Sequence, residues 1–201
     1  QTEKPVHDGV QNPNRCLSDF VAPLTDAMGQ PTGYKDYVGV FAVTSGLGVE
    51  AKEKYFMDDH DDYSAIMLKA LADRLAEAFA ECMHARVRRD LWGYAAGELL
   101  STEELIKEKY QGIRPAPGYP ACPDHSVKRA MFELLQCQDI GMTLTDSLAM
   151  TPAASVSGFY IGHPDACYFN VGRIGDDQVQ DLAHRQGVAE KDLLRLLAPN
   201  L

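Results

Sequence analysis

Long apolar runs are missing from this sequence of 201 residues. None approaches the roughly 18 consecutive apolar residues that a membrane-spanning helix requires. The N-terminal region also lacks the charged and apolar segments of a signal peptide. We therefore expect no membrane as a partner.

Basic residues are scarce relative to acidic ones. The 19 lysines and arginines are outnumbered by 29 aspartates and glutamates, so the formal net charge is -10. Such a protein repels a phosphate backbone unless it carries a strong local basic patch. The densest basic stretch, residues 86–89, is short, is followed by Asp90 and suits the C-terminal turn of a helix. Nucleic acid is therefore not expected as a partner.

Cysteines are few, odd in number and far apart in the sequence, and no C-x-x-C motif occurs. This pattern argues against a disulfide framework and against a structural zinc site. It favours a reducing, cytoplasmic location. The residues are Cys16, Cys82, Cys122, Cys137 and Cys167.

Motifs of catalytic and metal-binding sites are absent as well. Gly46 and Gly48 follow a predicted strand but lack the third glycine of a dinucleotide-binding fingerprint. The histidines show no HExxH spacing, and Ser157 is not part of a nucleophile elbow. The acidic run at residues 58–62 offers oxygen ligands to a cation, but it is more typical of a solvated helix N-terminus. We predict no catalytic residue and no metal ligand.

No internal repeat, low-complexity tract or flexible linker divides the chain, so residues 1–201 are predicted to form one domain. Because the chain begins with Gln1 and not with methionine, we expect an N-terminal part of the domain to be missing. Helical and extended segments alternate without a regular strand–helix–strand rhythm. This favours an α+β fold with a twisted antiparallel sheet flanked by helices. Predicted strands cover residues 37–44, 144–150, 155–161 and 167–174, and predicted helices cover 62–89, 101–110, 125–138, 176–185 and 190–197.

The longest predicted helix, residues 62–89, has Asp61 as an N-cap and many strong helix formers. Its apolar residues recur at three- and four-residue steps, which predicts one buried stripe with Glu77 at the margin, beside a cleft. A second helix starts with a capping box at Ser101 and carries Glu108 in its last turn. The helix dipole disfavours a carboxylate there unless a cation lies nearby. The predicted stripe comprises Tyr63, Met67, Ala70, Leu71, Leu75, Ala78 and Cys82.

Residues 112–120, the proline loop, contain three prolines and two glycines, which predicts a stiff, extended loop. Prolines reduce the entropy lost on binding, and we expect the carbonyls of the loop to be free for a ligand amine. Gly118 permits close backbone approach, Arg114 offers a planar fork to a carboxylate, and Tyr119 offers a ring and a hydroxyl. Such groups suit an amino acid or a nucleoside. The alternative is a packed loop in which Arg114 forms a salt bridge.

Several longer motifs resemble one known family. They are DRLAEAFAE and LWGYA in the first long helix region, YQGIRPAPGYPACPDH around the proline loop, and AASVSGFYIGHPD followed by DDQVQDLAHRQGV and LLAPNL. CLSDFVAP and DYVGVFAV match near the start of the chain. Together they resemble the activation domain of cobalamin-dependent methionine synthase over nearly the whole chain.

The resemblance implies that S-adenosylmethionine lies along the proline loop. Glu77 and Glu108 match two acidic residues near the cationic end of the ligand in that family. These positions agree with the independent expectation that both carboxylates lie close to a cation. The ligand-binding residues implied by the resemblance are Arg114, Ala116 through its backbone, Gly118, Tyr119, Tyr168, Glu77 and Glu108.

The resemblance also implies a function in reactivation. The domain presents S-adenosylmethionine to oxidised cobalamin, which another domain of the same enzyme binds, while a flavodoxin-like partner supplies an electron. The family's domain begins upstream with an Asp-Trp-Thr-Pro-Phe segment whose aspartate contacts the ligand, and this sequence does not contain it. We therefore expect the chain alone to bind weakly and to be inactive. The alternatives are a free-standing S-adenosylmethionine-dependent methyltransferase and a redox-partner docking module without a ligand site.

Overall fold

The computed structural model describes residues 6–7, 10–11 and 14–201, so Gln1 lies outside the described residues. Within the described ranges the chain forms helices of very different lengths, together with short 3-10 turns. The α-helices are α1 (Val49–Asp58), α2 (Asp62–Arg86), α3 (Thr102–Ile106), α4 (Lys128–Leu134), α5 (Asp176–Gln186) and α6 (Glu190–Leu197), and a π-helical turn, η2 (Val87–Leu91), extends α2.

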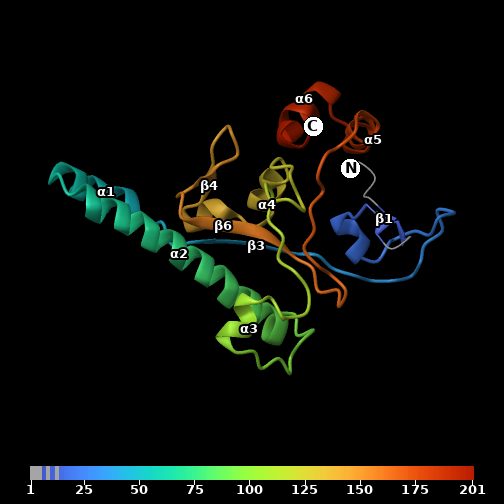
Figure 1. Cartoon of the computed structure of the whole chain (residues 1–201), viewed down its shortest axis with the longest axis horizontal. Helices are drawn as coiled ribbons and strands as arrows, with labels where there is room; N and C mark the ends of the chain where they lie inside the picture. The colour runs from blue at the N-terminus through green and yellow to red at the C-terminus, as the bar shows by residue number, and fades with distance from the viewer. Residues whose placement is uncertain (1–5, 8–9, 12–13) are drawn as a thin grey trace.

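The strands form antiparallel pairs, and the pair of β3 and β6 lies at the centre of the molecule (Figure 1). In its register, Gly39 lies opposite Tyr160 and Thr44 lies opposite Ser155. Two shorter hairpins pair β1 with β2 and β4 with β5. The antiparallel α+β prediction is therefore confirmed, although the sheet is narrower than expected. The bounds are β1 (Val6–His7), β2 (Val10–Gln11), β3 (Gly39–Thr44), β4 (Thr143–Leu144), β5 (Met150–Thr151) and β6 (Ser155–Tyr160).

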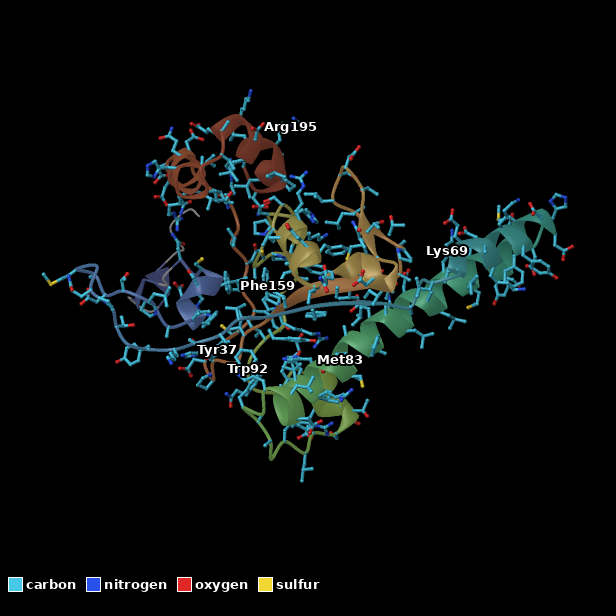
Figure 2. All side chains as sticks on the ribbon, turned by 180° about the vertical axis from the view of Figure 1, so that it is seen from behind. Tyr37, Lys69, Met83, Trp92, Phe159 and Arg195 are labelled. Atoms are coloured by element: carbon cyan, nitrogen blue, oxygen red, sulfur yellow. The ribbon has the colours of Figure 1, made fainter. Side chains whose placement is uncertain are left out.

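The central strand pair is covered on both faces, α2 crossing one side and α4 lying on the other (Figure 1). Side chains of β3 alternate between the faces, as the period of a strand requires. Phe41 and Val43 pack with Ala80 and Val87 on the α2 side, whereas Ala42 packs against the apolar cluster beside α4. The strand pair thus links two small cores. Met83 and Trp92, labelled in Figure 2, extend the core on the α2 side.

Helix ends follow the sequence closely where a capping residue is encoded. The Asp61 carboxylate accepts a hydrogen bond from the Ser64 amide at 3.0 Å, and α2 begins at the next residue after Asp61. Ser101 and Glu104 form the predicted capping box of α3. Gly187 ends α5 in the left-handed conformation. Side-chain caps fix these ends because they satisfy amides that the helix itself leaves unpaired.

Several segments differ from prediction. The helix predicted at residues 125–138 is confined to α4 and is followed by a 3-10 turn at Cys137–Ile140. Residues 49–58, for which no element was predicted, form α1, and Gly48 starts it with a φ of 80°. Residues 144–150 are not one strand, because a turn in which the Leu148 amide donates to the Thr145 carbonyl at 2.9 Å separates β4 from β5. Residues 167–174 run without forming a strand. An extended stretch becomes a strand only where a neighbouring backbone pairs with it.

The buried face of α2 is not the predicted one. Tyr63 and Leu75 of the predicted stripe are 73% and 62% exposed, and the other face is turned toward the strands. Small side chains allow the helix backbone to lie close to the sheet, where large side chains would not fit at native packing density. The residues buried along α2 are Ala65, Ala72, Ala76, Ala80 and His84.

The C-terminal helices form a separate small core. Val179 and Ala183 of α5 pack against Leu193 and Leu197 of α6, close to the C-terminus (Figure 1). In the part of the chain that the structure describes, no helix is long and apolar enough to cross a membrane.

Candidate functional site

A cavity of about 300 Å³ lies between the proline loop, α2 and the central strands. It brings together residues from six separated stretches of the chain, and all predicted binding residues except Gly118 line it. Its mixed apolar and charged wall and its volume fit the lower end of the range for small-molecule sites. We call it the proline-loop cavity. Its lining is Phe41, Glu77, Glu108, Arg114, Pro115, Ala116, Tyr119, Pro120, Ala121, Val156, Tyr168 and Phe169.

Backbone hydrogen bonds tie the proline loop to its neighbours. Ile113 and Ile161 exchange both of their backbone hydrogen bonds, at 2.9 and 3.0 Å. The Pro115 carbonyl accepts from the Phe159 amide at 2.9 Å, so this carbonyl is not free for a ligand amine as predicted. The Pro120 carbonyl likewise accepts from an amide, that of Val171, at 2.9 Å. These bonds hold the loop in place.

Gly118 has a different structural reason from the predicted one. Its φ is +94°, in the region that side chains disfavour, and an added Cβ would collide with the imidazole of His125. The Gly118 amide donates to the Cys122 carbonyl at 2.7 Å and closes the end of the loop. Gly118 therefore shapes the loop from outside the lining of the cavity, and its predicted contact with a ligand stays a prediction.

Arg114 is held by three neighbours. Its Nη1 forms an ion pair with Glu81 Oε2 at 2.7 Å and donates to Tyr110 Oη at 3.0 Å, and its backbone amide donates to Tyr168 Oη at 3.0 Å. Burial lowers the pKa of Arg114, but Tyr110, Glu81 and Tyr168 outweigh that effect and raise it above its ordinary value. The salt bridge considered as the alternative thus exists. It occupies one nitrogen of the guanidinium and does not remove Arg114 from the cavity wall.

Glu77 and Glu108 both line the cavity, although Glu77 lies in α2 and Glu108 lies just after α3. Both side chains are exposed to solvent at this surface. The predicted position of Glu108 in the last turn of a helix is wrong, because α3 ends at Ile106 and Glu108 has a left-handed φ of 52°. A non-glycine residue in this region is unfavourable by roughly 1–2 kcal/mol, so the fold compensates for that cost. The tight backbone turn, and not the helix dipole, brings Glu108 toward Glu77.

A buried network of charged and aromatic residues behind the cavity was not predicted. Arg88 is fully buried, and its Nε and Nη2 donate to the two oxygens of Glu98 at 2.8 and 2.7 Å. Its guanidinium lies 4.2 Å from the centre of the Tyr110 ring. The sequence spacing does indicate that Glu77, Glu81 and Arg88 share one side of a helix, because they follow one another at four- and seven-residue steps. Such a row of charged side chains is normally solvated, so its burial could not be predicted from the sequence.

His84 lies within the same network. Its ring stacks on Tyr160 with centroids 5.2 Å apart, and Nε2 lies 3.4 Å from Tyr94 Oη. Burial and the adjacent Arg88 and Arg114 lower the pKa of His84 to about 2. The imidazole is therefore neutral at physiological pH and acts as a packed ring.

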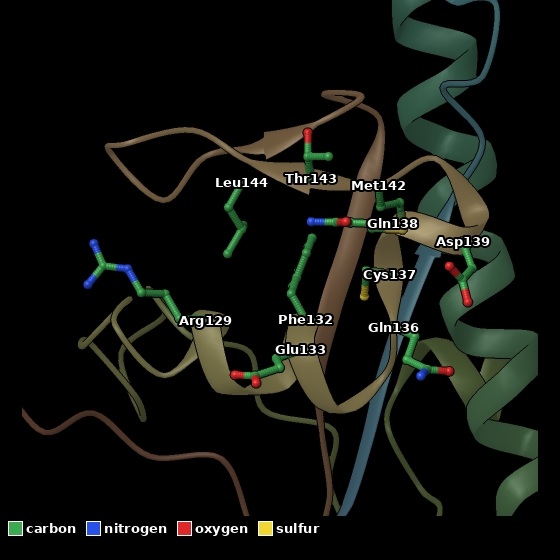
Figure 3. Close-up of a pocket in the computed structure, with 10 residues that line it drawn as sticks. All are labelled: Arg129, Phe132, Glu133, Gln136, Cys137, Gln138, Asp139, Met142, Thr143 and Leu144. Carbon is green, nitrogen blue, oxygen red and sulfur yellow. The ribbon is translucent and has the colours of Figure 1, made fainter.

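A second cavity, of about 510 Å³, lies between α4 and the β4 hairpin (Figure 3). Its floor belongs to the apolar core, through Phe132, Cys137 and Met142. None of the predicted site residues is among the described residues that line it. The polar residues at its rim are Arg129, Glu133, Gln136, Gln138, Asp139 and Thr143.

The remaining side-chain chemistry is sparse. The five cysteines are free thiols, and burial raises the pKa of Cys122 to about 11. A search of residues 6–7, 10–11 and 14–201 finds no cluster of three or more His, Cys, Asp or Glu that could hold a metal ion. No cysteine is among the described residues that line the proline-loop cavity.

Comparisons with known proteins point to one family. Residues 1–187 match the family model described as vitamin B12 dependent methionine synthase, activation domain. A solved structure described as the MetH reactivation domain bound to AdoHcy is similar, with a TM-score of 0.85 and 57% sequence identity. The match covers 92% of this chain and 56% of that chain, so the present chain spans little more than half of its relative. The resemblance found in the sequence motifs is confirmed: the chain belongs to the family of the activation domain of vitamin B12-dependent methionine synthase.

Proposed function

We propose that this chain binds S-adenosylmethionine in the proline-loop cavity and presents it for the reductive methylation of cobalamin. The observation that carries the proposal is the convergence of Arg114, Glu77, Glu108, Tyr119 and Tyr168 on one cavity. A relative with 57% sequence identity has been solved with AdoHcy, the demethylated product of this ligand, which supports the same ligand class here. Family membership supports the role in methionine synthase reactivation.

The lining residues fit the parts of this ligand. The Nε and Nη2 atoms of Arg114 form a planar edge that matches a carboxylate with two parallel hydrogen bonds. Glu77 and Glu108 provide negative charge for the sulfonium and the ammonium group. Tyr119 and Tyr168 offer ring faces on which a purine stacks. The cavity therefore combines the groups that an amino-acid nucleoside requires.

The chain itself contributes binding and orientation. When bound, S-adenosylmethionine supplies an electrophilic methyl group on its sulfonium. Transfer of that group needs no acid or base from the protein, so the absence of a catalytic histidine or cysteine motif is in keeping with the proposal. Holding the ligand in one orientation reduces the entropy cost of reaction with cobalamin held by another domain.

The proposed partners are the cobalamin-binding domain of the same enzyme and a flavodoxin-like electron donor, in the cytoplasm. The activity is that of a methyltransferase, to which this chain supplies the activation step.

One observation argues against a free-standing methyltransferase. Such an enzyme normally places a glycine-rich turn after the first strand of a parallel sheet. Here the turn with Gly46 and Gly48 does follow β3 and precedes α1, but β3 pairs antiparallel with β6. The docking module without a ligand site is separated from our proposal by the binding experiment below.

Calorimetric titration with S-adenosylmethionine and S-adenosylhomocysteine tests the proposal. Lysine at position 114 keeps the charge but loses the planar fork, so Arg114→Lys should weaken binding by roughly ten- to hundredfold. The matched control is Arg129→Lys, because Arg129 lies at the rim of the second cavity. We expect that control to bind normally.

A wild-type chain that binds neither ligand would favour the docking module. If Arg129→Lys abolished binding and Arg114→Lys did not, the ligand would lie in the second cavity. Repeating the titrations with a longer polypeptide that includes the upstream segment would measure how much that segment adds to affinity.

A further inference from the structure

Glu81 connects the proline-loop cavity with the buried network, although it was not among the predicted site residues. Resting on the proposed function, we propose that Glu81 is a positioning residue, which fixes the guanidinium of Arg114 so that its Nε–Nη2 edge binds the carboxylate of the ligand. Glu81 does not line the cavity itself among the described residues. It therefore acts through Arg114.

The hydrogen bonds of Arg114 define which edge is available. Nη1 forms an ion pair with Glu81 Oε2 at 2.7 Å and donates a hydrogen bond to Tyr110 Oη at 3.0 Å. No residue of the described structure accepts a hydrogen bond from Nε or Nη2. Because these two nitrogens form one planar edge, they match the two oxygens of a carboxylate. Glu81 and Tyr110 thus orient the guanidinium without competing for that edge.

Glu81 is in turn held from behind. Its Oε1 lies 3.9 Å from Nη1 of Arg88, and both atoms are buried without a hydrogen-bond partner among the described residues. Arg88 cannot move toward the cavity easily, because Glu98 binds it through two hydrogen bonds and Tyr110 packs against its guanidinium. The attraction between opposite charges is strong in such a poorly solvated place. Arg88 therefore keeps Glu81 in position for Arg114.

Loss of the Glu81 charge would release Arg114. The network consists of Arg88, Arg114, Glu81 and Glu98. Without the charge of Glu81, one carboxylate remains in the network for two cations. Arg114 would then sample several rotamers, and a ligand carboxylate would have to order it again on binding. Preorganisation of this kind affects only ligands that use the ordered group.

The test compares two ligands that differ in the amino-acid part. S-adenosylhomocysteine carries an ammonium and a carboxylate on that part, and 5′-methylthioadenosine has the same thionucleoside with a methyl group in its place. In Glu81→Gln, we expect the dissociation constant for S-adenosylhomocysteine to rise by roughly tenfold. The constant for 5′-methylthioadenosine should not change. The matched control, Glu103→Gln on the exposed surface of α3, should leave both constants unchanged.

The pattern of losses decides the role of Glu81. Equal weakening of both ligands would show a general structural role and overturn the proposal. Unchanged or tighter binding of S-adenosylhomocysteine would show that Glu81 competes with the ligand, which also overturns it. A wild-type chain that binds neither ligand would instead overturn the proposed function, and with it the site on which Glu81 acts.

A second variant covers the case in which Glu81→Gln does not fold, as judged by circular dichroism. Tyr110→Phe removes only the hydroxyl that accepts a hydrogen bond from Arg114 Nη1. It should weaken S-adenosylhomocysteine selectively, by roughly threefold. Absence of that selective loss would contradict the positioning of Arg114 through Nη1.

Discussion

Replacing His84 with phenylalanine should remove a large part of the acid sensitivity of folding. His84 is fully buried, stacks on Tyr160, and has an Nδ1 without a hydrogen-bond partner in the described structure. Burial and the nearby cations Arg88 and Arg114 lower its pKa to about 2, from an ordinary value of 6.5. Phenylalanine has a similar shape and does not titrate, so it tests the charge while keeping most of the packing.

The expected magnitude follows from proton linkage. The folded state keeps His84 neutral far below pH 6.5, whereas the unfolded chain takes up a proton as the pH falls through 6.5. Stability from the neutral imidazole is therefore present above pH 6.5 and declines as the pH falls toward 2. With a slope approaching about 1.4 kcal/mol per pH unit, the loss between pH 7 and pH 5 is about 2 kcal/mol.

Urea unfolding at pH 7, 6 and 5 measures this effect. The free energy of unfolding of the wild type should fall by about 2 kcal/mol more than that of His84→Phe between pH 7 and pH 5. Groups common to both proteins cancel in this difference. His184→Phe, at an exposed histidine of α5, is the control and should retain the wild-type pH dependence. Parallel pH profiles for the wild type and His84→Phe would refute the burial of a neutral imidazole.

Two further predictions concern the cavity acids and the buried face of α2. Glu77→Gln and Glu108→Gln should each weaken the binding of S-adenosylmethionine about two- to fivefold more than that of S-adenosylhomocysteine, whose sulfur is uncharged. The effect is small because both carboxylates are exposed and screened. Equal losses in titrations of the two ligands would mean that the acids shape the cavity without sensing charge. Leu75→Gln should change the free energy of unfolding by less than about 0.5 kcal/mol, whereas Ala76→Leu should destabilise by about 1–3 kcal/mol, since Leu75 is exposed and Ala76 packs toward the strands. If urea unfolding showed a larger loss of stability for Leu75→Gln than for Ala76→Leu, the predicted stripe would be the buried face of α2.

Local chemistry in the sequence determined the helix ends and the loop. Asp61, the capping box at Ser101 and the terminal Gly187 act on backbone groups within a few residues, so they specify the same structure in any tertiary setting. The prolines of residues 112–120 restrict the backbone in the same local way. Family membership was also determined at this level, because the motifs that carry it are contiguous.

Tertiary structure decided which side chains meet. The apolar periodicity of α2 correctly predicted a helix, but small alanines and not the large apolar residues such as Leu75 face the strands, since close approach of backbones selects for size as well as hydrophobicity. Residues 167–174 are extended in pattern but have no neighbouring strand to pair with. Both outcomes depend on what packs against a segment, which its own sequence does not specify.

The candidate site divides along the same line. Arg114 and Tyr119 belong to one contiguous motif, so the sequence alone located them. Glu77 and Glu81 meet that loop although both lie more than thirty residues before Arg114 in the sequence. Such contacts depend on how α2, the loop and the strands pack, because a carboxylate in a helix is buried or solvated according to its neighbours in space.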